Sequence, residues 1–355
     1  MSAEKVLEHF REQATYCTMF GSPFTGELIA RMADDLEAGG PVAGLVGAWP
    51  GSARADVVAL RLCGALHAAV LMGRDAALAA TYPGASAAWS MDQVWPAARA
   101  FLAREHAWVT EFLGSAPQTN ETRRSIALLA CFLEFAKSWD GPIDTLEIGA
   151  SAGLNLHWDR FAYRTATWSW GDASPVIIDT DWNGPPPAIQ TRIAVRDRAA
   201  CDLNPLDIRD PSQLLRLKSY IWPDQADRLA RFDGAVALAI ESGARVERAD
   251  AAAWIGDKLA ARAKDAATIV YHSVFLQYPP RETRAAIVKA IEQEGARADA
   301  TAPLVWVRTE PEALFGGPRD SQRMVIDFIA WPNGRRRIMG YTDGHVRAVY
   351  AGVQA

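Results

Sequence analysis

The chain has 355 residues, enough for two domains, and its 50% hydrophobic and 22% charged content is typical of a globular protein. The net charge of −5 argues against a large nucleic-acid surface, and the scattered four cysteines and six histidines argue against a disulfide framework or a metal site. No apolar run approaches the roughly 20 residues that span a bilayer, and residues 1–10 lack the apolar stretch of a secretory signal. We therefore expect a cytoplasmic protein without membrane contact.

Helical spacing of apolar residues dominates the first 140 residues. The predicted helices, separated by turns rich in glycine and proline, span residues 5–20, 24–38, 55–72, 94–113 and 121–139. Asn120 stands at the expected N-cap of the last one. Because no catalytic pattern occurs here, we predict a helical domain over residues 1–140 that shapes a substrate site, with a purely structural or dimerising bundle as the alternative.

From residue 141 onward, short apolar runs alternate with helical segments. Strands are predicted at 146–148, 176–178, 193–201, 244–246, 268–272, 304–307, 324–331, 335–340 and 345–350, and helices at 222–241, 254–263 and 283–294. This alternation predicts an α/β domain over residues 141–355 with a mostly parallel sheet. Asn333-Gly334 is typical of a hairpin turn, so the sheet should finish with an antiparallel hairpin. The aromatic-rich segment at about 157–190 is predicted to be an insertion in this α/β domain.

The first of these strands leads into a turn of small residues. Glu147 and Ile148 are followed by the sequence Gly149-Ala150-Ser151-Ala152-Gly153, and a helix can begin at Leu154. Glycines let the backbone approach a ligand, and a helix N-terminus offers unpaired N–H groups. Glu147 is unusual in an apolar strand, since a buried carboxylate is unfavourable unless it is paired. We therefore expect Glu147 to face the turn or a ligand.

Parallel units followed by a hairpin resemble class I S-adenosylmethionine-dependent methyltransferases, over residues 143–350. That family carries an acidic residue and three glycines after its first strand, and the matching residues here are Glu147, Gly149, Ser151 and Gly153, with Ser151 replacing the middle glycine. The resemblance implies a Rossmann-like fold that binds S-adenosylmethionine. It also implies that these residues, with Asn155 just beyond, contact the cofactor.

Two further acids follow later strands. In the family, an acid after the second strand holds the ribose hydroxyls, and a carboxylate suits a vicinal diol. Asp202 is the candidate here, although it lies well beyond the roughly 20 residues of a usual βαβ unit, and Asp179 is the rival. Asp250, with Ala251, resembles the family position beside the adenine amino group.

Substrate-side residues are expected after the fourth main strand. Ligands collect at the carboxyl ends of parallel strands, and His272 and Tyr278 follow that strand. His272 could serve as a general base near neutral pH, and a structural histidine is the alternative. Glu310, after the next strand, is a weaker candidate of the same kind.

The turn also matches the sequence motif of a second class of enzyme. Gly149-Ala150-Ser151-Ala152-Gly153 matches the G-x-S-x-G nucleophile elbow of serine hydrolases. Ser151 would then act with an acid, Asp250 or Asp327, and with a base, His272 or His345. That fold needs several strands before the elbow, whereas helices precede it here. A third interpretation is a non-catalytic protein that binds a nucleoside as a sensor.

The whole chain also resembles an uncharacterised bacterial family, domain of unknown function 2332. The segments that carry this likeness are 39–41, 117–121, 147–158, 201–207, 222–225 and 248–251. This resemblance implies no activity, substrate or catalytic residue. The prediction is therefore a methyltransferase that acts on an unidentified small molecule.

Overall fold

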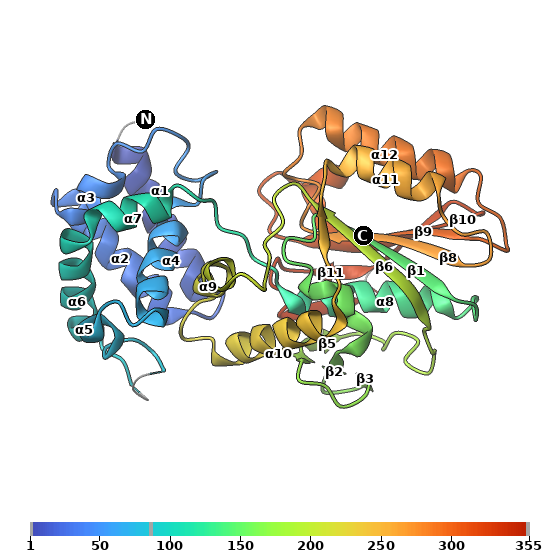
Figure 1. Ribbon diagram of the computed structural model, residues 1–355, viewed down its shortest axis with the longest axis horizontal. Coiled ribbons are helices and arrows are strands. Elements are labelled where there is room, and N and C mark those ends of the chain that lie inside the picture. Colours follow the sequence, from blue (N-terminus) through green and yellow to red (C-terminus); the bar gives the residue numbers. More distant parts are fainter. Residues whose placement is uncertain (1–2, 85–87, 353–355) are drawn as a thin grey trace. The chain divides into compact units, whose positions relative to one another are not determined.

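The computed structural model describes residues 3–84 and 88–352, which form two compact units. One unit is helical and comprises residues 1–119 and 209–230; the other is an α/β unit of residues 120–208 and 231–355. Figure 1 labels the elements of each. Within the described residues, no helix combines the length and apolar character needed to cross a bilayer.

Eight helices lie wholly within the described residues of the helical unit. They are α1 (Ala3–Met19), α2 (Pro23–Glu37), α3 (Pro41–Val46), α4 (Val58–Leu71), α5 (Ala76–Ala79), α6 (Met91–Arg104), α7 (His106–Leu113) and α9 (Pro211–Ser219). The predicted helix over 94–113 is two helices, because the chain turns at Glu105, which accepts hydrogen bonds from Arg74. No glycine or proline marks that break.

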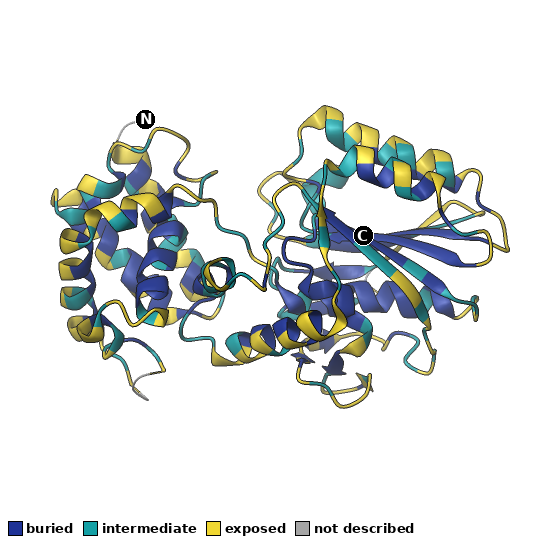
Figure 2. Ribbon diagram, in the orientation of Figure 1, coloured by how far each residue is buried: buried dark blue, intermediate teal, exposed yellow. Residues whose placement is uncertain are grey.

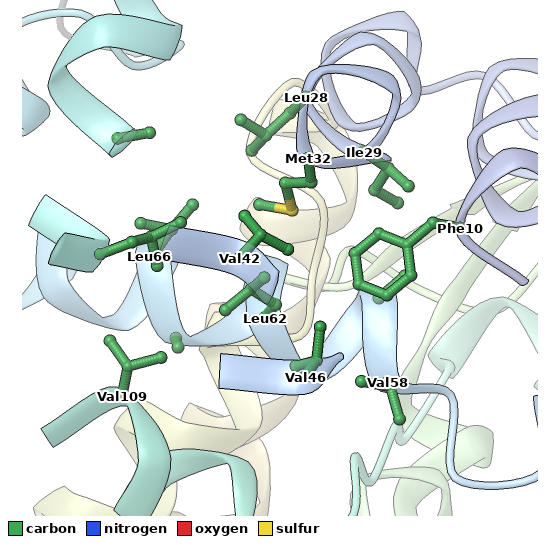
Figure 3. Close-up of a cluster of buried hydrophobic side chains, with 14 of the residues drawn as sticks. Phe10, Leu28, Ile29, Met32, Val42, Val46, Val58, Leu62, Leu66 and Val109 are labelled. Carbon is green, nitrogen blue, oxygen red and sulfur yellow. The ribbon is translucent and has the colours of Figure 1, made fainter. Parts of the chain in front are cut away.

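Apolar side chains from these helices point toward one another and form the core of the helical unit. Phe10, Met32, Val42, Leu62 and Val109 are all fully buried in it (Figure 3). Burial of each such side chain contributes about 1.5–3 kcal/mol. The sequence pattern of apolar positions every three to four residues therefore has its expected consequence, a core shared by several amphipathic helices.

Residues 209–230 join the helical unit through specific contacts, although the sequence places them far from it. Asp210 caps α9 by accepting hydrogen bonds from Ser212 and Gln213. Asp224 accepts a hydrogen bond from the hydroxyl of Ser22 and another, at 3.0 Å, from the backbone N–H of Phe24. The predicted boundary at residue 140 is therefore corrected, because the helical unit consists of the chain up to Thr119 together with residues 209–230.

The α/β unit begins with a short 3-10 helix, η1 (Thr122–Arg124), and α8 (Ser125–Ala136). Nearly every residue of α8 is buried, because it packs on the sheet against β9 and β10. A helix that is apolar on all sides belongs in an interior. This packing explains why α8 belongs to the α/β unit and not to the helical one.

The main sheet has nine strands in the order β5-β12-β11-β10-β9-β8-β1-β6-β7. Their bounds are β1 (Ile143–Ile148), β5 (Asp181–Asn183), β6 (Val195–Asp202), β7 (Val246–Arg248), β8 (Ala267–Ser273), β9 (Leu304–Pro311), β10 (Met324–Trp331), β11 (Arg335–Thr342) and β12 (Ala348–Ala351). Strands β7, β6, β1, β8 and β9 are parallel, and β10 to β12 continue antiparallel. The predicted α/β class with a mostly parallel sheet and a terminal hairpin is confirmed.

Helices cover both faces of this sheet. α11 (Ala251–Ala260) and α12 (Arg281–Gly295) lie on one face and α8 on the other (Figure 1). The central strands β8 and β9 are consequently buried along almost their whole length (Figure 2). Double coverage explains their continuous apolar runs. The remaining helices are α10 (Ala226–Ser242), which begins in the helical unit, and the 3-10 helices η2 (Leu154–Arg160) and η3 (Glu312–Phe315).

The aromatic segment after β1 forms a second, three-stranded sheet. It has the order β3 (Ser169–Trp170), β2 (Ala162–Arg164) and β4 (Ile177–Asp179). Trp158 is fully buried, with its ring 4.3 Å from that of Phe132 on α8, measured between centroids. The predicted insertion therefore has its own sheet, and β5 carries the chain from it to the edge of the main sheet.

Candidate functional site

The order of the parallel strands reverses at β1. From β1 the chain adds β6 and then β7 on one side, and it later places β8 and β9 on the other side. In open parallel sheets, ligands bind beyond the carboxyl ends of the strands at such a reversal. The turn Gly149–Gly153 directly follows β1, so the topology places it at this position.

The turn needs its glycines for two reasons. Gly149 and Gly153 have φ values of 70° and 75°, in the left-handed region that side chains disfavour. A Cβ on Gly149 would also lie 2.1 Å from Cδ2 of Phe275, in the loop after β8. Ser151 adopts φ 54° without being glycine. The backbone is therefore held in a strained shape by its surroundings.

Most N–H groups of the turn are already bound within the protein, contrary to the expectation of free donors. Gly149 and Ala150 donate to the carbonyl oxygen of Cys201 at 2.9 and 3.1 Å. Leu154 donates to Oδ1 of Asn120 at 2.8 Å. The segment that follows is the seven-residue 3-10 helix η2, with non-helical geometry at His157. The expectation of an open helix N-terminus is therefore corrected, because Asn120 already satisfies its first N–H.

Asp202 connects the turn to the end of β6. Its Oδ2 accepts from the N–H of Ser151, and its Oδ1 accepts from the N–H of Asn204, both at 2.8 Å. Each carboxylate oxygen has a second lone pair, so both can still accept from a ligand. The residue is partly exposed. Asp202 can therefore support the turn and bind a diol at once.

Asp250 lies on the same edge of the sheet, one strand further along. Asp202 is in register with Arg248 of β7, and the N–H of Ala249 donates to the Asp202 carbonyl oxygen at 3.1 Å. Asp250 is exposed and caps α11, its Oδ1 accepting from Ala252 and Ala253. Its Oδ2 has no donor among the described residues. Ala251 is the first residue of α11.

Asp179, the rival of Asp202, belongs to a different sheet. It ends β4 and pairs with Arg164 of β2 in the three-stranded sheet. Asp202 ends the strand that is the immediate neighbour of β1. Of the two acids, only Asp202 therefore ends a strand next to the turn, and the intervening aromatic segment accounts for its unusual distance from β1 in the sequence.

Glu147 is buried beside Tyr271. Its Oε2 accepts from the Tyr271 hydroxyl at 3.2 Å, and only 4% of the residue is exposed. Burial raises the pKa of Glu147 to about 8, with the Tyr271 hydrogen bond opposing that rise. The side chain is therefore mainly a neutral carboxylic acid at pH 7, which explains how the strand tolerates it.

Two buried polar atoms near the turn have no partner. Neither Oγ of Ser151 nor Oδ1 of Asn155 makes a hydrogen bond within residues 3–84 and 88–352. The Asn155 amide donates from Nδ2 to the carbonyl oxygen of Glu121 at 3.3 Å, which fixes its orientation. An unmade hydrogen bond on a buried group is unfavourable by about 1–3 kcal/mol. These atoms are therefore suited to meet a bound molecule.

His272 has both ring nitrogens engaged. Its Nδ1 lies 2.6 Å from Oε1 of Glu310, and its Nε2 accepts from the indole N–H of Trp306 at 3.0 Å. The ring is fully buried. This arrangement fixes one neutral tautomer and leaves no lone pair for a substrate proton. The geometry thus favours the structural alternative for His272 over the general base.

Glu310 in turn holds the loop after β8. Its carboxylate accepts from the backbone N–H groups of Phe275 and Leu276 at 2.8–3.2 Å. The pair of His272 and Glu310 therefore positions Phe275, whose ring lies against Gly149. Tyr278, in the same loop, is 74% exposed. Of the two predicted catalytic residues, only Tyr278 is available to a substrate.

The residues of a serine hydrolase are not brought together. Asp327 is fully buried and accepts from Arg308 and Arg336. His345 follows β11, four strands from β1, which corresponds to about 19 Å at the usual strand spacing of about 4.8 Å. Ser151 thus has the strained backbone of a nucleophile elbow but no candidate base beside it.

Sequence reasoning missed Asn120, Glu121, Tyr271 and Phe275 as parts of this site. Asn120 was expected to cap the helix after it, yet its side chain binds Leu154. These four residues come from segments distant in sequence from the turn. Their only signal was the position of Tyr271 and Phe275 in and just after a strand that borders the reversal point.

The candidate site consists of the turn Gly149–Gly153, Asp202 and Asp250. In the described part of the chain, no three His, Cys, Asp or Glu side chains could jointly hold a metal ion. The protein is of the α/β class, and a glycine turn and two carboxylates stand at the carboxyl ends of neighbouring parallel strands, where proteins of this class commonly bind ligands.

Residues 7–350 match the model of a family described as an uncharacterized protein conserved in bacteria (DUF2332), and the chain belongs to that family. No curated protein matches the chain. A solved structure described as the DhpI-SAM-HEP complex is similar at 10% identity and a TM-score of 0.23. That likeness covers 61% of this chain and 77% of the other.

Proposed function

We propose that the α/β unit binds S-adenosylmethionine and transfers its methyl group to a small-molecule acceptor. The observation that supports this most is the placement of the turn Gly149–Gly153, Asp202 and Asp250 at the carboxyl ends of three neighbouring strands. The two carboxylates offer acceptors for a ribose diol and for an adenine amino group.

The hydrogen bonding of the turn also favours a nucleoside without a phosphate chain. Dinucleotide and triphosphate sites use free backbone N–H groups to hold phosphate oxygens. Here the N–H groups of Gly149, Ala150 and Ser151 are bound within the protein. Carboxylates beside the turn would also repel a phosphate. S-adenosylmethionine carries no phosphate and has a positively charged sulfur, which suits an acidic edge.

The residues present fit this cofactor. Ser151 Oγ and Asn155 Oδ1 are buried polar atoms without partners at the turn, and Glu147 and Gly153 complete its frame. S-adenosylmethionine, when bound, supplies an already activated methyl group. The protein then needs to align the acceptor and exclude water. Phe275 covers the turn, and the exposed Tyr278 is the candidate to contact the acceptor.

Titration calorimetry of the full chain tests the proposal. We expect micromolar binding of S-adenosylmethionine and of S-adenosylhomocysteine, and no comparable binding of NAD. Absence of binding by both nucleosides would refute the cofactor assignment. Binding of NAD alone would indicate that the cofactor is a dinucleotide instead.

A pair of matched variants locates the site. Asp202→Asn removes the charge that accepts from a diol and should weaken binding at least tenfold. Asp299→Asn is the control. Asp299 also accepts from two backbone N–H groups in a loop, but this loop precedes β9 and so lies at the amino ends of the parallel strands, away from the candidate site. Equal effects of the two substitutions on cofactor affinity would show that the cofactor does not bind at Asp202.

The alternatives give different outcomes. Labelling of Ser151 by a fluorophosphonate would favour the serine hydrolase, for which the strained φ of Ser151 is the supporting observation. Nucleoside binding without turnover across a broad acceptor screen would favour the sensor. If the protein is a methyltransferase, Tyr278→Phe should lower its turnover and leave the dissociation constant of the cofactor unchanged.

A further inference from the structure

The loop after β8 borders the turn at the end of β1. β8 runs parallel to β1 as its direct neighbour, and the loop begins at Val274. The ring of Phe275 lies against the turn, since a Cβ on Gly149 would be only 2.1 Å from Cδ2 of Phe275. Phe275 is partly exposed. A molecule bound at the turn can therefore contact this residue.

The backbone of this loop has an unfavourable conformation. Val274 has a φ of 53°, in the left-handed region, where a β-branched residue is a rare outlier. Its N–H donates to the carbonyl oxygen of Thr309 at 2.8 Å. Strained residues of this kind persist only where surrounding contacts impose their conformation, and they cluster at ligand sites. The loop is therefore held in place by other parts of the α/β unit.

The buried carboxylate of Glu310 holds the next two residues of the loop. Its Oε1 accepts from the N–H of Phe275 at 2.8 Å, and both of its oxygens accept from the N–H of Leu276 at 3.2 Å. The same Oε1 lies 2.6 Å from Nδ1 of His272. A buried charge depends on its hydrogen bonds. The loss of the His272 donor should therefore destabilise the carboxylate that holds the loop.

Trp306 determines which nitrogen of His272 carries the proton. An indole N–H can only donate, so Nε2 of His272, 3.0 Å from Nε1 of Trp306, has to accept. The proton of the neutral ring is then on Nδ1, which donates to Glu310. The hydrogen bonds thus run in one direction, from Trp306 through His272 and Glu310 to the backbone of Phe275.

We propose that Phe275 forms a fixed wall of the binding site at the turn, and that Glu310 and His272 are positioning residues that hold this wall in place. The identity of the bound molecule rests on the function proposed above. Asp202 ends β6, on the side of β1 opposite to β8, so the bound molecule meets a carboxylate on one side and an aromatic ring on the other. A wall that is ordered before binding avoids the entropic cost of ordering it.

Two substitutions of His272 test the positioning role without any ligand. Asparagine and leucine both remove the acceptor of the Trp306 N–H, but only the asparagine amide keeps an N–H donor near the place of Nδ1. ¹⁹F NMR of the full chain, with 4-fluorophenylalanine at position 275, reports the surroundings of that ring. His272→Asn should keep the wild-type chemical shift. His272→Leu and Glu310→Gln should move it toward the value of the free amino acid.

Circular dichroism of each variant establishes that the chain is still folded, so that the fluorine signal reports the loop. An unmoved fluorine resonance in both His272→Leu and Glu310→Gln would overturn the positioning role. Equal displacement in His272→Asn and His272→Leu would do the same, because the donor to Glu310 would then have no effect on the ring.

Calorimetry with S-adenosylhomocysteine tests the wall itself. Phe275→Leu should weaken binding about tenfold, because it removes the aromatic surface beside the turn. The matched control is Phe315→Leu, which should leave the dissociation constant unchanged. Phe315 is also partly exposed and follows a parallel strand, yet it packs against Arg308 and Arg336.

Binding to Phe275→Leu that is as tight as in wild type, or tighter, would overturn the wall, since the ring would then be irrelevant to the ligand or block it. Absence of binding to wild type would refute the proposed function. The fluorine comparison would in that case still support or overturn the positioning of Phe275, so the two failures are distinguishable.

Discussion

Two buried histidines of the helical unit and a buried acid of the α/β unit are stabilised in different ways. In the helical unit, His9 accepts from the N–H of Ala59 at 3.3 Å and His67 contacts the Ser219 carbonyl oxygen, and burial lowers the pKa of both to about 4. Backbone groups there stabilise neutral rings. In the α/β unit, the fully buried acid Asp327 instead meets the basic side chains of Arg308 and Arg336 directly.

This difference determines which kind of change would destabilise each of these cores. A core that contains neutral polar groups is sensitive to protonation, because a new charge has no partner. A core that contains charged pairs is sensitive to the loss of one member, because the other member is left as a buried charge. Three changes test this contrast, from the largest expected effect to the smallest.

Asp327→Ala should destabilise the α/β unit by about 3–5 kcal/mol. Asp327 is fully buried and accepts from Nε and Nη2 of Arg308 at 2.7 and 2.8 Å, and Arg308 is 6% exposed. Truncation leaves that guanidinium without its main partner. Urea unfolding followed by circular dichroism measures the change in the free energy of unfolding.

The control lies in the helical unit, where Asp92 pairs with Arg31 at 3.1 Å and has a side chain that is 86% exposed. Asp92→Ala should change stability by no more than about 1 kcal/mol, as is typical of a surface ion pair. Similar losses from the two substitutions would remove the contrast between the units.

Glu147→Gln should make the α/β unit less sensitive to alkali. Burial raises the pKa of Glu147 from its ordinary value of 4.5 to about 8 in the folded protein. The stability it confers is complete below pH 4.5 and is lost as the pH rises through 8. Glutamine keeps the neutral shape. Its advantage over wild type should therefore grow by about 2–4 kcal/mol between pH 5 and pH 8; urea denaturation curves that stay parallel across this range would contradict the assignment.

His67→Gln should protect the helical unit from acid. Burial lowers the pKa of His67 from its ordinary value of 6.5 to about 4 in the folded protein. The stability that neutral His67 confers on the fold is therefore complete above pH 6.5 and declines as the pH falls toward 4. We expect a loss of about 1–2 kcal/mol in wild type between pH 7 and pH 5 that the variant lacks. Hydrogen exchange of peptides from α4, corrected for intrinsic rates, measures it, and an unchanged wild-type protection would count against buried His67.

Local sequence signals predicted the elements well where caps and periodicity agreed. The helix predicted over residues 24–38 is α2, and the predicted turn Asn333-Gly334 closes the β10–β11 hairpin. The short helix α9 was missed although Asp210-Pro211 is a start signal. Its weakly apolar sequence gave no clear periodicity.

The candidate site was only partly predictable, for a physical reason. The turn Gly149–Gly153 and the strand-end acids carry local signals, because turns and strand ends require particular residues. The occupied N–H groups and the contact of Phe275 with Gly149 depend on residues from distant segments, such as Asn120 and Glu310. Tertiary packing alone decides those contacts, so periodicity and spacing cannot report them.

The two edges of the nine-stranded sheet have a consequence for how the protein avoids self-association. The edge strands β5 and β7 each have three residues and carry charge at Asp181 and at Glu247 and Arg248. Long, flat, uncharged edges recruit strands from other molecules. Because β5 covers β12 with the chain's own backbone, deleting residues 181–183 would expose β12 and should promote aggregation.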